Sequence, residues 1–177
     1  MSVDPALFRS AAGSLPSGLT VITTGEPGNY HAMTASAVCS LSLEPTMFMV
    51  CIDQKARTLG HIRRARAFNI NVLAAHQVHL SQAFARSGAE HSLSMEEGTF
   101  RIGRQGLPVI VDCVTALECT LTNELPGGDH VILLGEVSHV AISEDQKPLL
   151  YFRGRYGRLH DDDAQLDTPR VSTDAVH

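Results

Sequence analysis

Small hydroxyl side chains occupy one side of an alternating segment that runs from Thr34 to Leu43. If this segment is extended, its two faces are Thr34, Ser36, Val38, Ser40 and Ser42 on one side and Ala35, Ala37, Cys39, Leu41 and Leu43 on the other. Exposed strand faces usually carry long polar side chains, and core faces carry Val or Ile. Small hydroxyls let a ligand approach the backbone and offer it donors and acceptors. We interpret the first face as a ligand-binding face, and a solvated Ser/Thr face is the alternative.

Positive charge follows the next apolar segment. The Glu44-Pro45 turn signal precedes the run TMFMVCI at 46–52, which predicts a strand buried on both sides. The run opens into Asp53 and then Lys55, Arg57 and Thr58, whose side chains could bind a phosphate together with the N-terminus of the following helix. For the later cations Arg63, Arg64 and Arg66, a solvated basic helix face is an equal alternative.

Several classes of function are disfavoured by what the sequence lacks. There is no catalytic triad pattern, no carboxylate pair, no HExxH pair, and no GxGxxG or GxxxxGK[ST] loop. A net charge of -5 argues against nucleic acid as a partner, and the apolar runs are too short to cross a bilayer. The four cysteines lie in apolar strand patterns without metal spacing, which predicts buried reduced thiols in a cytoplasmic protein.

Short strands outnumber helices in the predicted element order. Asp4 and Pro5 begin a helix that ends near Pro16, and further helices are predicted around 56–65 and 80–84. Strands are predicted at 19–24, 34–43, 46–52, 68–73, 109–111, 117–121, 131–137, 140–142 and 149–152, with turns at 25–28 and 126–129 and a mobile loop at 88–98. This order predicts one mainly β domain over 1–159, a closed antiparallel β-barrel with peripheral helices. Residues 160–177 are predicted to be a disordered tail.

A series of segments in this order resembles a known family. The segments are GLTVIT, MTASAVCSLSLEPTMFMVCIDQKART, FNINVL, LSQAFA, GLPVI, ALEC, GDHVILLGEV and PLLYFRGRYGRL, and together they span Phe8 to Leu159. They resemble the short-chain flavin reductases, the reductase components of two-component flavin-dependent monooxygenases. The resemblance implies the FMN-binding split barrel, an antiparallel Greek-key β-barrel, which agrees with the fold class predicted above.

The resemblance also implies which residues bind the ligands. It places the isoalloxazine and ribityl chain of the flavin against Thr34, Ala35 and Ser36, and Met33 and Ile52 are further cofactor-binding residues. Asp53, Lys55, Arg57 and Thr58 line the ribityl-phosphate side. Ala85 and Arg86 would close the site, with Arg86 a second phosphate partner. Asp129 and His130 match a Gly-Asp-His motif whose histidine lies beside the nicotinamide, and Arg155 and Tyr156 would help to cover both ligands. One departure is His31-Ala32-Met33 where the family often has Gly, so no contact is assigned to Ala32.

The implied activity is hydride transfer from NADH or NADPH to FMN or FAD, with release of the reduced flavin to a transient partner monooxygenase. Such chemistry needs no nucleophile, because the cofactors perform it and the protein orients them. The family forms homodimers, and the apolar segments Val109–Val111 and Leu149–Phe152 are consistent with a subunit contact. The alternatives are a split-barrel protein that retains tightly bound FMN and a flavin-binding module without turnover.

Overall fold

The computed structural model describes residues 3–85, 95 and 98–159. The predicted phosphate partner Arg86, most of the predicted loop at 88–98 and the predicted tail from His160 lie outside these residues.

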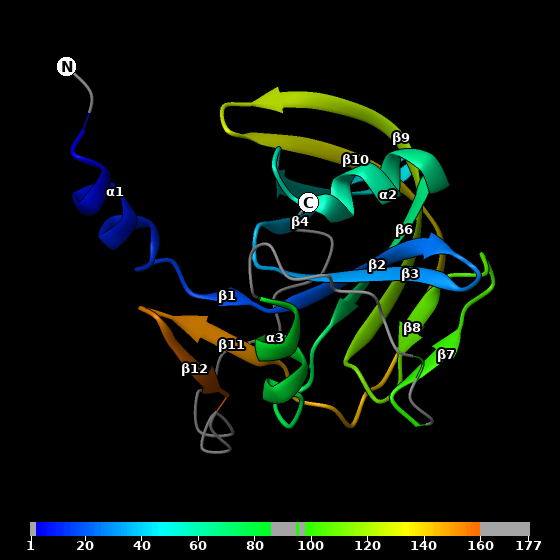
Figure 1. Ribbon diagram of the computed structural model, residues 1–177. Helices are drawn as coiled ribbons and strands as arrows, with labels where there is room; N and C mark the ends of the chain where they lie inside the picture. The colour runs from blue at the N-terminus through cyan, green and yellow to red at the C-terminus, as the bar shows by residue number, and fades with distance from the viewer. Residues whose placement is uncertain (1–2, 86–94, 96–97, 160–177) are drawn as a thin grey trace.

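A seven-stranded antiparallel sheet dominates the fold, in the order β3-β2-β6-β9-β10-β5-β4 (Figure 1). Its strands are β2 (Thr20–Glu26), β3 (Asn29–Ala35), β4 (Val38–Leu43), β5 (Thr46–Asp53), β6 (Ala67–Val72), β9 (Thr115–Gly127) and β10 (His130–Ile142). A three-stranded sheet joins β1 (Ser17–Gly18), β11 (Leu149–Phe152) and β12 (Arg155–Arg158), and β7 (Phe100–Ile102) pairs with β8 (Pro108–Ile110). The helices are α1 (Pro5–Ala12), α2 (Arg57–Ala65) and α3 (Val78–Phe84). The mainly β antiparallel fold class is therefore confirmed.

The large sheet is open rather than closed, because its edge strands β3 and β4 do not pair with each other. This corrects the prediction of a closed barrel. The predicted strand at 34–43 is two strands, because β3 ends at Ala35 and pairs with β2, whereas β4 begins at Val38 and pairs with β5. These two strands are the opposite edges of the sheet, and Ser36 and Ala37 join them. The two kinds of side chain keep alternating through this junction because the segments on both sides are extended. The sequence pattern therefore does not indicate where one strand ends and the next begins.

Two buried apolar clusters lie on the two faces of the central strands. One contains Val50 and Ile52 of β5 with Phe68 and Leu133, and the other contains Val21, Val109, Ile110 and Leu149. The predicted burial of β5 on both sides is wrong, since Met47, Met49 and Cys51 on its second face are only half-buried. Val109, Ile110 and Leu149 pack within the chain's own core, so these residues are not available for the subunit contact suggested above.

One carboxylate is buried although it alternates along its strand with the apolar residues Leu117 and Cys119. Glu118 of β9 is 1% exposed, and its two carboxylate oxygens accept the backbone N–H groups of Arg104 and Gln105 at 3.0 and 2.8 Å. These bonds compensate for the lost hydration of the carboxylate and fix the turn after β7 over the sheet.

All four cysteines are free thiols, but they are not all buried as predicted. Burial raises the pKa of Cys113 to about 11 and that of Cys119 to about 12. Cys39 is exposed and Cys51 is half-buried, because both lie toward the open β4 edge of the large sheet. Among the described residues, none of the helices has the length and apolar character needed to cross a membrane.

Helix α2 packs on the β2–β3 hairpin through a pair of stacked histidines. The rings of His31 on β3 and His61 on α2 lie 3.3 Å apart between centroids, and Arg64 hydrogen-bonds His61 Nδ1 at 2.8 Å. Burial lowers the pKa of His61, and the nearby His31 and Arg64 lower it further, while Glu26 opposes the shift.

We expect this pair to make stability depend on pH. Because its folded pKa is depressed, His61 binds a proton more readily in the unfolded chain, so the free energy of unfolding should fall as pH decreases through about 6.5. His61→Gln should reduce this slope in urea unfolding measured between pH 7.5 and 5.5. The same replacement at exposed His79 on α3 is the control, and an equal change in both variants would contradict the prediction.

Candidate functional site

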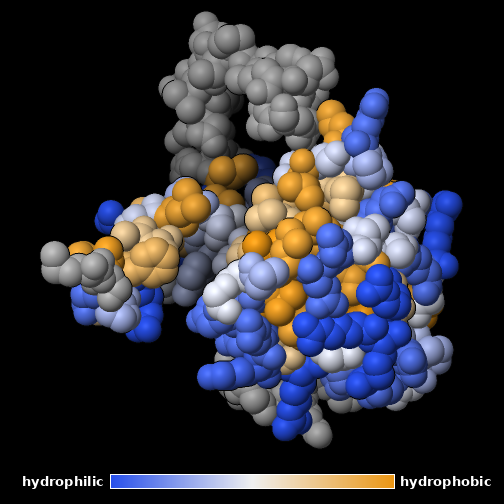
Figure 2. Space-filling model, turned by 90° about the horizontal axis from the view of Figure 1, so that it is seen from above, coloured by the Kyte–Doolittle hydropathy of each residue, from blue (hydrophilic) through white to orange (hydrophobic). Residues whose placement is uncertain are grey.

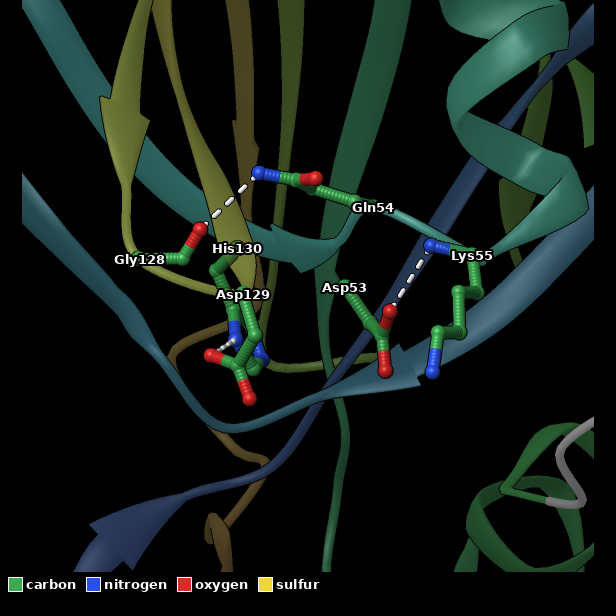
Figure 3. A network of polar contacts seen from close by, with 6 residues as sticks. All are labelled: Asp53, Gln54, Lys55, Gly128, Asp129 and His130. Atoms are coloured by element: carbon green, nitrogen blue, oxygen red, sulfur yellow. Dashed lines mark hydrogen bonds and ion pairs between the residues drawn. The ribbon is translucent and has the colours of Figure 1, made fainter.

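Two turns that are distant in the sequence meet at one end of the large sheet (Figure 3). Asp53, the last residue of β5, pairs in register with His130, the first residue of β10. Gln54 then ties the turns together, since its backbone N–H donates to the Asp129 carbonyl at 3.0 Å and its Nε2 donates to the Gly128 carbonyl at 2.9 Å. The β5–α2 turn and the β9–β10 turn therefore form one hydrogen-bonded unit.

Asp129 and His130 are hydrogen-bonded to each other at the tip of this unit. Nδ1 of His130 lies 2.7 Å from Oδ1 of Asp129, and the hydrogen bond from His130 lowers the pKa of the Asp129 carboxyl. The carboxylate therefore stays ionised at neutral pH and orients the imidazole. The His130 side chain is 42% exposed, so its ring remains accessible to a ligand.

The phosphate-binding residues predicted from the sequence surround the start of α2. Ala56 is the N-cap and makes no side-chain capping bond, so the first helical N–H groups have no side-chain acceptor from this residue. Thr58 is buried in the first turn, while Lys55 and Arg57 are exposed on either side of Ala56. The Asp53 carboxylate accepts the Lys55 backbone N–H at 2.7 Å, which shapes the turn leading into the helix. This end of α2 combines positive charge with the positive end of a helix dipole, which suits an anion.

The later cations of α2 contact the protein itself. Arg63 pairs with Glu124 at 2.9 Å, Arg64 hydrogen-bonds His61, and Arg66 donates to the Leu121 carbonyl at 2.9 Å. Arg63 and Arg66 fasten this helix to β9, and Arg64 bonds the His61 ring that stacks on His31 of β3. The three arginines are therefore neither part of the anion end nor simply a solvated face.

A second polar network joins β3, α3 and β12. Oγ1 of Thr34 donates to the Ser81 carbonyl at 2.8 Å, and the Ser81 hydroxyl lies 3.3 Å from the Tyr156 hydroxyl on β12. Ser81 is buried, and Tyr156 packs edge-to-face on Tyr151 with their ring centroids 5.7 Å apart. Thr34 and Tyr156 are thus brought together through Ser81, which sequence reasoning missed although it lies within the quoted segment LSQAFA.

The remaining predicted residues divide by their position. Ala35 and Ile52 direct their side chains into the core cluster that contains Phe68, and Met33 packs against this cluster while staying half-buried. Ser36 is exposed at the junction between β3 and β4. Ala85 is exposed at the C-cap of α3, and Arg155 is exposed on β12 without a side-chain bond to the described residues.

A family comparison decides what kind of domain carries this site. The model of the flavin reductase like domain matches residues 12–160 of the chain. The chain belongs to this family. The match spans both turns of the site, α2, α3 and β12.

Named relatives of this flavin reductase-like domain cover most of its length. It is 36% identical to "NADH-dependent FMN reductase AsuE2" of Streptomyces nodosus subsp. asukaensis, over 87% of this chain and 84% of that protein. It is 37% identical to the reductase component of 4-nitrophenol 4-monooxygenase/4-nitrocatechol 2-monooxygenase of Rhodococcus opacus, over 89% of this chain and 82% of that protein. The solved structure of "Flavin reductase PheA2 in native state" has a TM-score of 0.80 and 39% identity, covering 89% of this chain and 99% of that one.

The residues of this flavin reductase-like domain fit a bound flavin mononucleotide moiety. The α2 N-terminus with Lys55, Arg57 and Thr58 matches the chemistry of a phosphate, and the small side chains at Thr34, Ser36 and Ala37 leave the β3–β4 junction open to a ring system. Among the described residues, no cluster of three His, Cys, Asp or Glu side chains could hold a metal ion.

Proposed function

We propose that this chain is an NADH-dependent flavin reductase that transfers a hydride from the nicotinamide to FMN or FAD. The single observation that carries the proposal is that hydrogen bonds join the N-terminus of α2, which suits an anion, to the turn with the accessible Asp129–His130 pair. One turn suits the flavin phosphate and the other suits the nicotinamide. NADH rather than NADPH is proposed because similar proteins are named NADH-dependent.

The hydride chemistry itself belongs to the two bound groups, so the protein's part is to hold and orient them. We propose that Lys55, Arg57, Thr58 and the α2 N–H groups bind the phosphate, with Asp53 shaping their turn. The backbones of Met33, Ala35 and Ile52 and the side chains of Thr34 and Ser36 would contact the flavin. Ala85, Arg155 and Tyr156 would cover it, and His130 would orient the nicotinamide carboxamide. Positioning of this kind supplies much of the rate when the reacting atoms need close alignment.

We further propose that the reduced flavin is released to a separate monooxygenase. The relative from Rhodococcus opacus is named as a monooxygenase reductase component, and the exposed anion end of the site gives a bound flavin access to solvent. A tightly bound flavin would instead remain with the protein. Gel filtration of the purified protein separates these two cases, since a retained yellow colour would contradict release.

Steady-state oxidation of NADH and of NADPH, with FMN, FAD and riboflavin in turn, tests the activity directly. NADH oxidation that depends on added flavin is the expected result. Flavin binding without any NADH oxidation would replace the proposal with a non-catalytic flavin-binding module.

A second copy of the chain is the partner that we propose for the open apolar surfaces. Half-buried Met47, Met49 and Cys51 on β5 adjoin Ile132 and Leu134 on β10, and the β4 edge adds exposed Leu41 and Leu43. Helix α1 contributes no buried residue, and Figures 1 and 2 show it standing apart from the body with apolar groups exposed. An eight-residue helix gains most of its stability from packing, which favours a covered state for α1.

The four free thiols are compatible with a reducing, cytoplasmic location.

Met49→Lys should dissociate the proposed homodimer. Burying one large apolar side chain contributes about 2 kcal/mol, and the loss occurs once in each copy, so about 4 kcal/mol is at stake. Dimerisation should therefore weaken by at least about 100-fold. Light scattering at micromolar concentration should give the dimer mass for the wild type and the monomer mass for this variant. Ile142→Lys, at an exposed site elsewhere on β10, is the matched control, and a monomeric wild type would contradict the proposal.

A further inference from the structure

Gln54 is the side chain that joins the two halves of the site, although its residue type suggests no chemistry. It lies between Asp53 and Lys55, but Figure 3 shows its side chain extending away from those two toward the Gly128 carbonyl. The donor–acceptor distance is 2.9 Å, and the two residues are 74 positions apart in the sequence. A bond of this kind links the anion end of the site to the turn that carries Asp129 and His130.

Backbone bonds hold the turn that Gln54 contacts, but side-chain packing adds little support to it. Gly127, Gly128 and Asp129 are all exposed, and Gly128 has a φ of 74°, which an L-residue rarely adopts. A cavity of about 390 Å³ lies next to Gln54 between α2 and the β9–β10 hairpin, with Leu59, Leu125 and Pro126 among its walls. Apart from its chain neighbours, no atom of the described residues lies within 4 Å of the position that a Cβ would take on Gly128. Side-chain packing therefore does little to fix the Gly128 peptide.

We propose that Gln54 is a positioning residue that sets the affinity for the pyridine nucleotide by holding the Gly128–His130 turn against the β5–α2 turn. This inference rests on the proposed function. Gln54 acts through His130 and does not contact the reacting atoms. The backbone bond from Gln54 to the Asp129 carbonyl remains in any variant, so the side chain controls the orientation of the Gly128 peptide rather than the existence of the turn.

Two replacements separate the hydrogen bond from the bulk of the side chain. Gln54→Met keeps the length and removes the donor, whereas Gln54→Lys keeps a donor that can reach the Gly128 carbonyl. Thr122→Val is the matched control, since it removes a 2.9 Å side-chain bond to the Leu134 carbonyl within the same hairpin, away from its turn.

Anaerobic stopped-flow reduction at varied NADH, together with fluorescence titration of FMN, gives the two affinities separately. Gln54→Met should raise the apparent dissociation constant for NADH by about three- to tenfold, the range expected for loss of one hydrogen bond, and leave FMN affinity within twofold. Gln54→Lys and Thr122→Val should behave like the wild type.

Two results would overturn the inference. One is wild-type NADH affinity in Gln54→Met, and the other is an equal loss of NADH and FMN affinity, which would indicate a general structural role. Failure of the proposed function is distinguishable, because the wild type itself would then not reduce FMN with NADH.

Discussion

Replacing Lys55 and Arg57 together by glutamine is expected to weaken FMN binding by about 100-fold. Each side chain lies beside the start of α2, and a hydrogen bond to a charged group contributes about 1.5 kcal/mol at the lower end of its usual range. Two such bonds correspond to roughly two powers of ten in the dissociation constant. Fluorescence titration of the free flavin measures the change.

Riboflavin is the internal control for this variant, because it has the ring system and ribityl chain without the phosphate. Its affinity should stay within about twofold if Lys55 and Arg57 act on the phosphate alone. Arg101→Gln combined with Arg104→Gln removes the same amount of charge at exposed positions around the β7 turn and should leave FMN affinity unchanged. Equal losses for FMN and riboflavin would assign the two cations to another part of the ligand.

Replacing His130 by alanine is expected to raise the apparent dissociation constant for NADH about tenfold, or to slow flavin reduction by a similar factor. The imidazole is accessible, is oriented by the Asp129 carboxylate 2.7 Å away, and lies at the tip of the hairpin turn. Losing one orienting hydrogen bond to the carboxamide accounts for a change of this size. Flavin affinity should be nearly unchanged, and anaerobic stopped-flow reduction at varied NADH separates the two effects.

Asp129→Asn provides the companion variant. Its amide oxygen can still accept a hydrogen bond from His130, but the charge that holds the imidazole is lost, so a smaller loss of NADH affinity is expected than in His130→Ala. If His130→Ala reduces flavin with wild-type constants, His130 is a turn residue only, and the nicotinamide must be held by other groups.

Some parts of the site could be predicted from the sequence because the signals are local. Asp4 and Pro5 marked the start of α1, and the Asp4 side chain indeed accepts the Leu7 N–H at 2.9 Å. The apolar run before Asp53 predicted β5, and the spacing of Leu59 and Ile62 predicted α2, both of which the structure contains. Capping and periodicity act over a few residues, so these elements carry their own evidence along the chain.

Other features were set by contacts between distant segments. The alternating segment from Thr34 to Leu43 gave no sign of the break at Ser36, because β3 and β4 pair with different strands. Glu118 alternates with the apolar residues Leu117 and Cys119 yet is buried, since two backbone N–H groups of a separate turn satisfy its carboxylate. Burial on both faces of β9 is a property of the folded sheet and not of its local pattern.

By itself, the sequence determined the mainly β class, the family resemblance and the positions of the cationic turn and the Gly-Asp-His turn. Only the tertiary structure decided that Asp53 pairs with His130, that Gln54 bonds Gly128, and that Ser81 connects Thr34 with Tyr156. The physical reason is that strand register and side-chain bonds between remote segments depend on the packing of the whole sheet, whereas residue type and spacing report only local conformation.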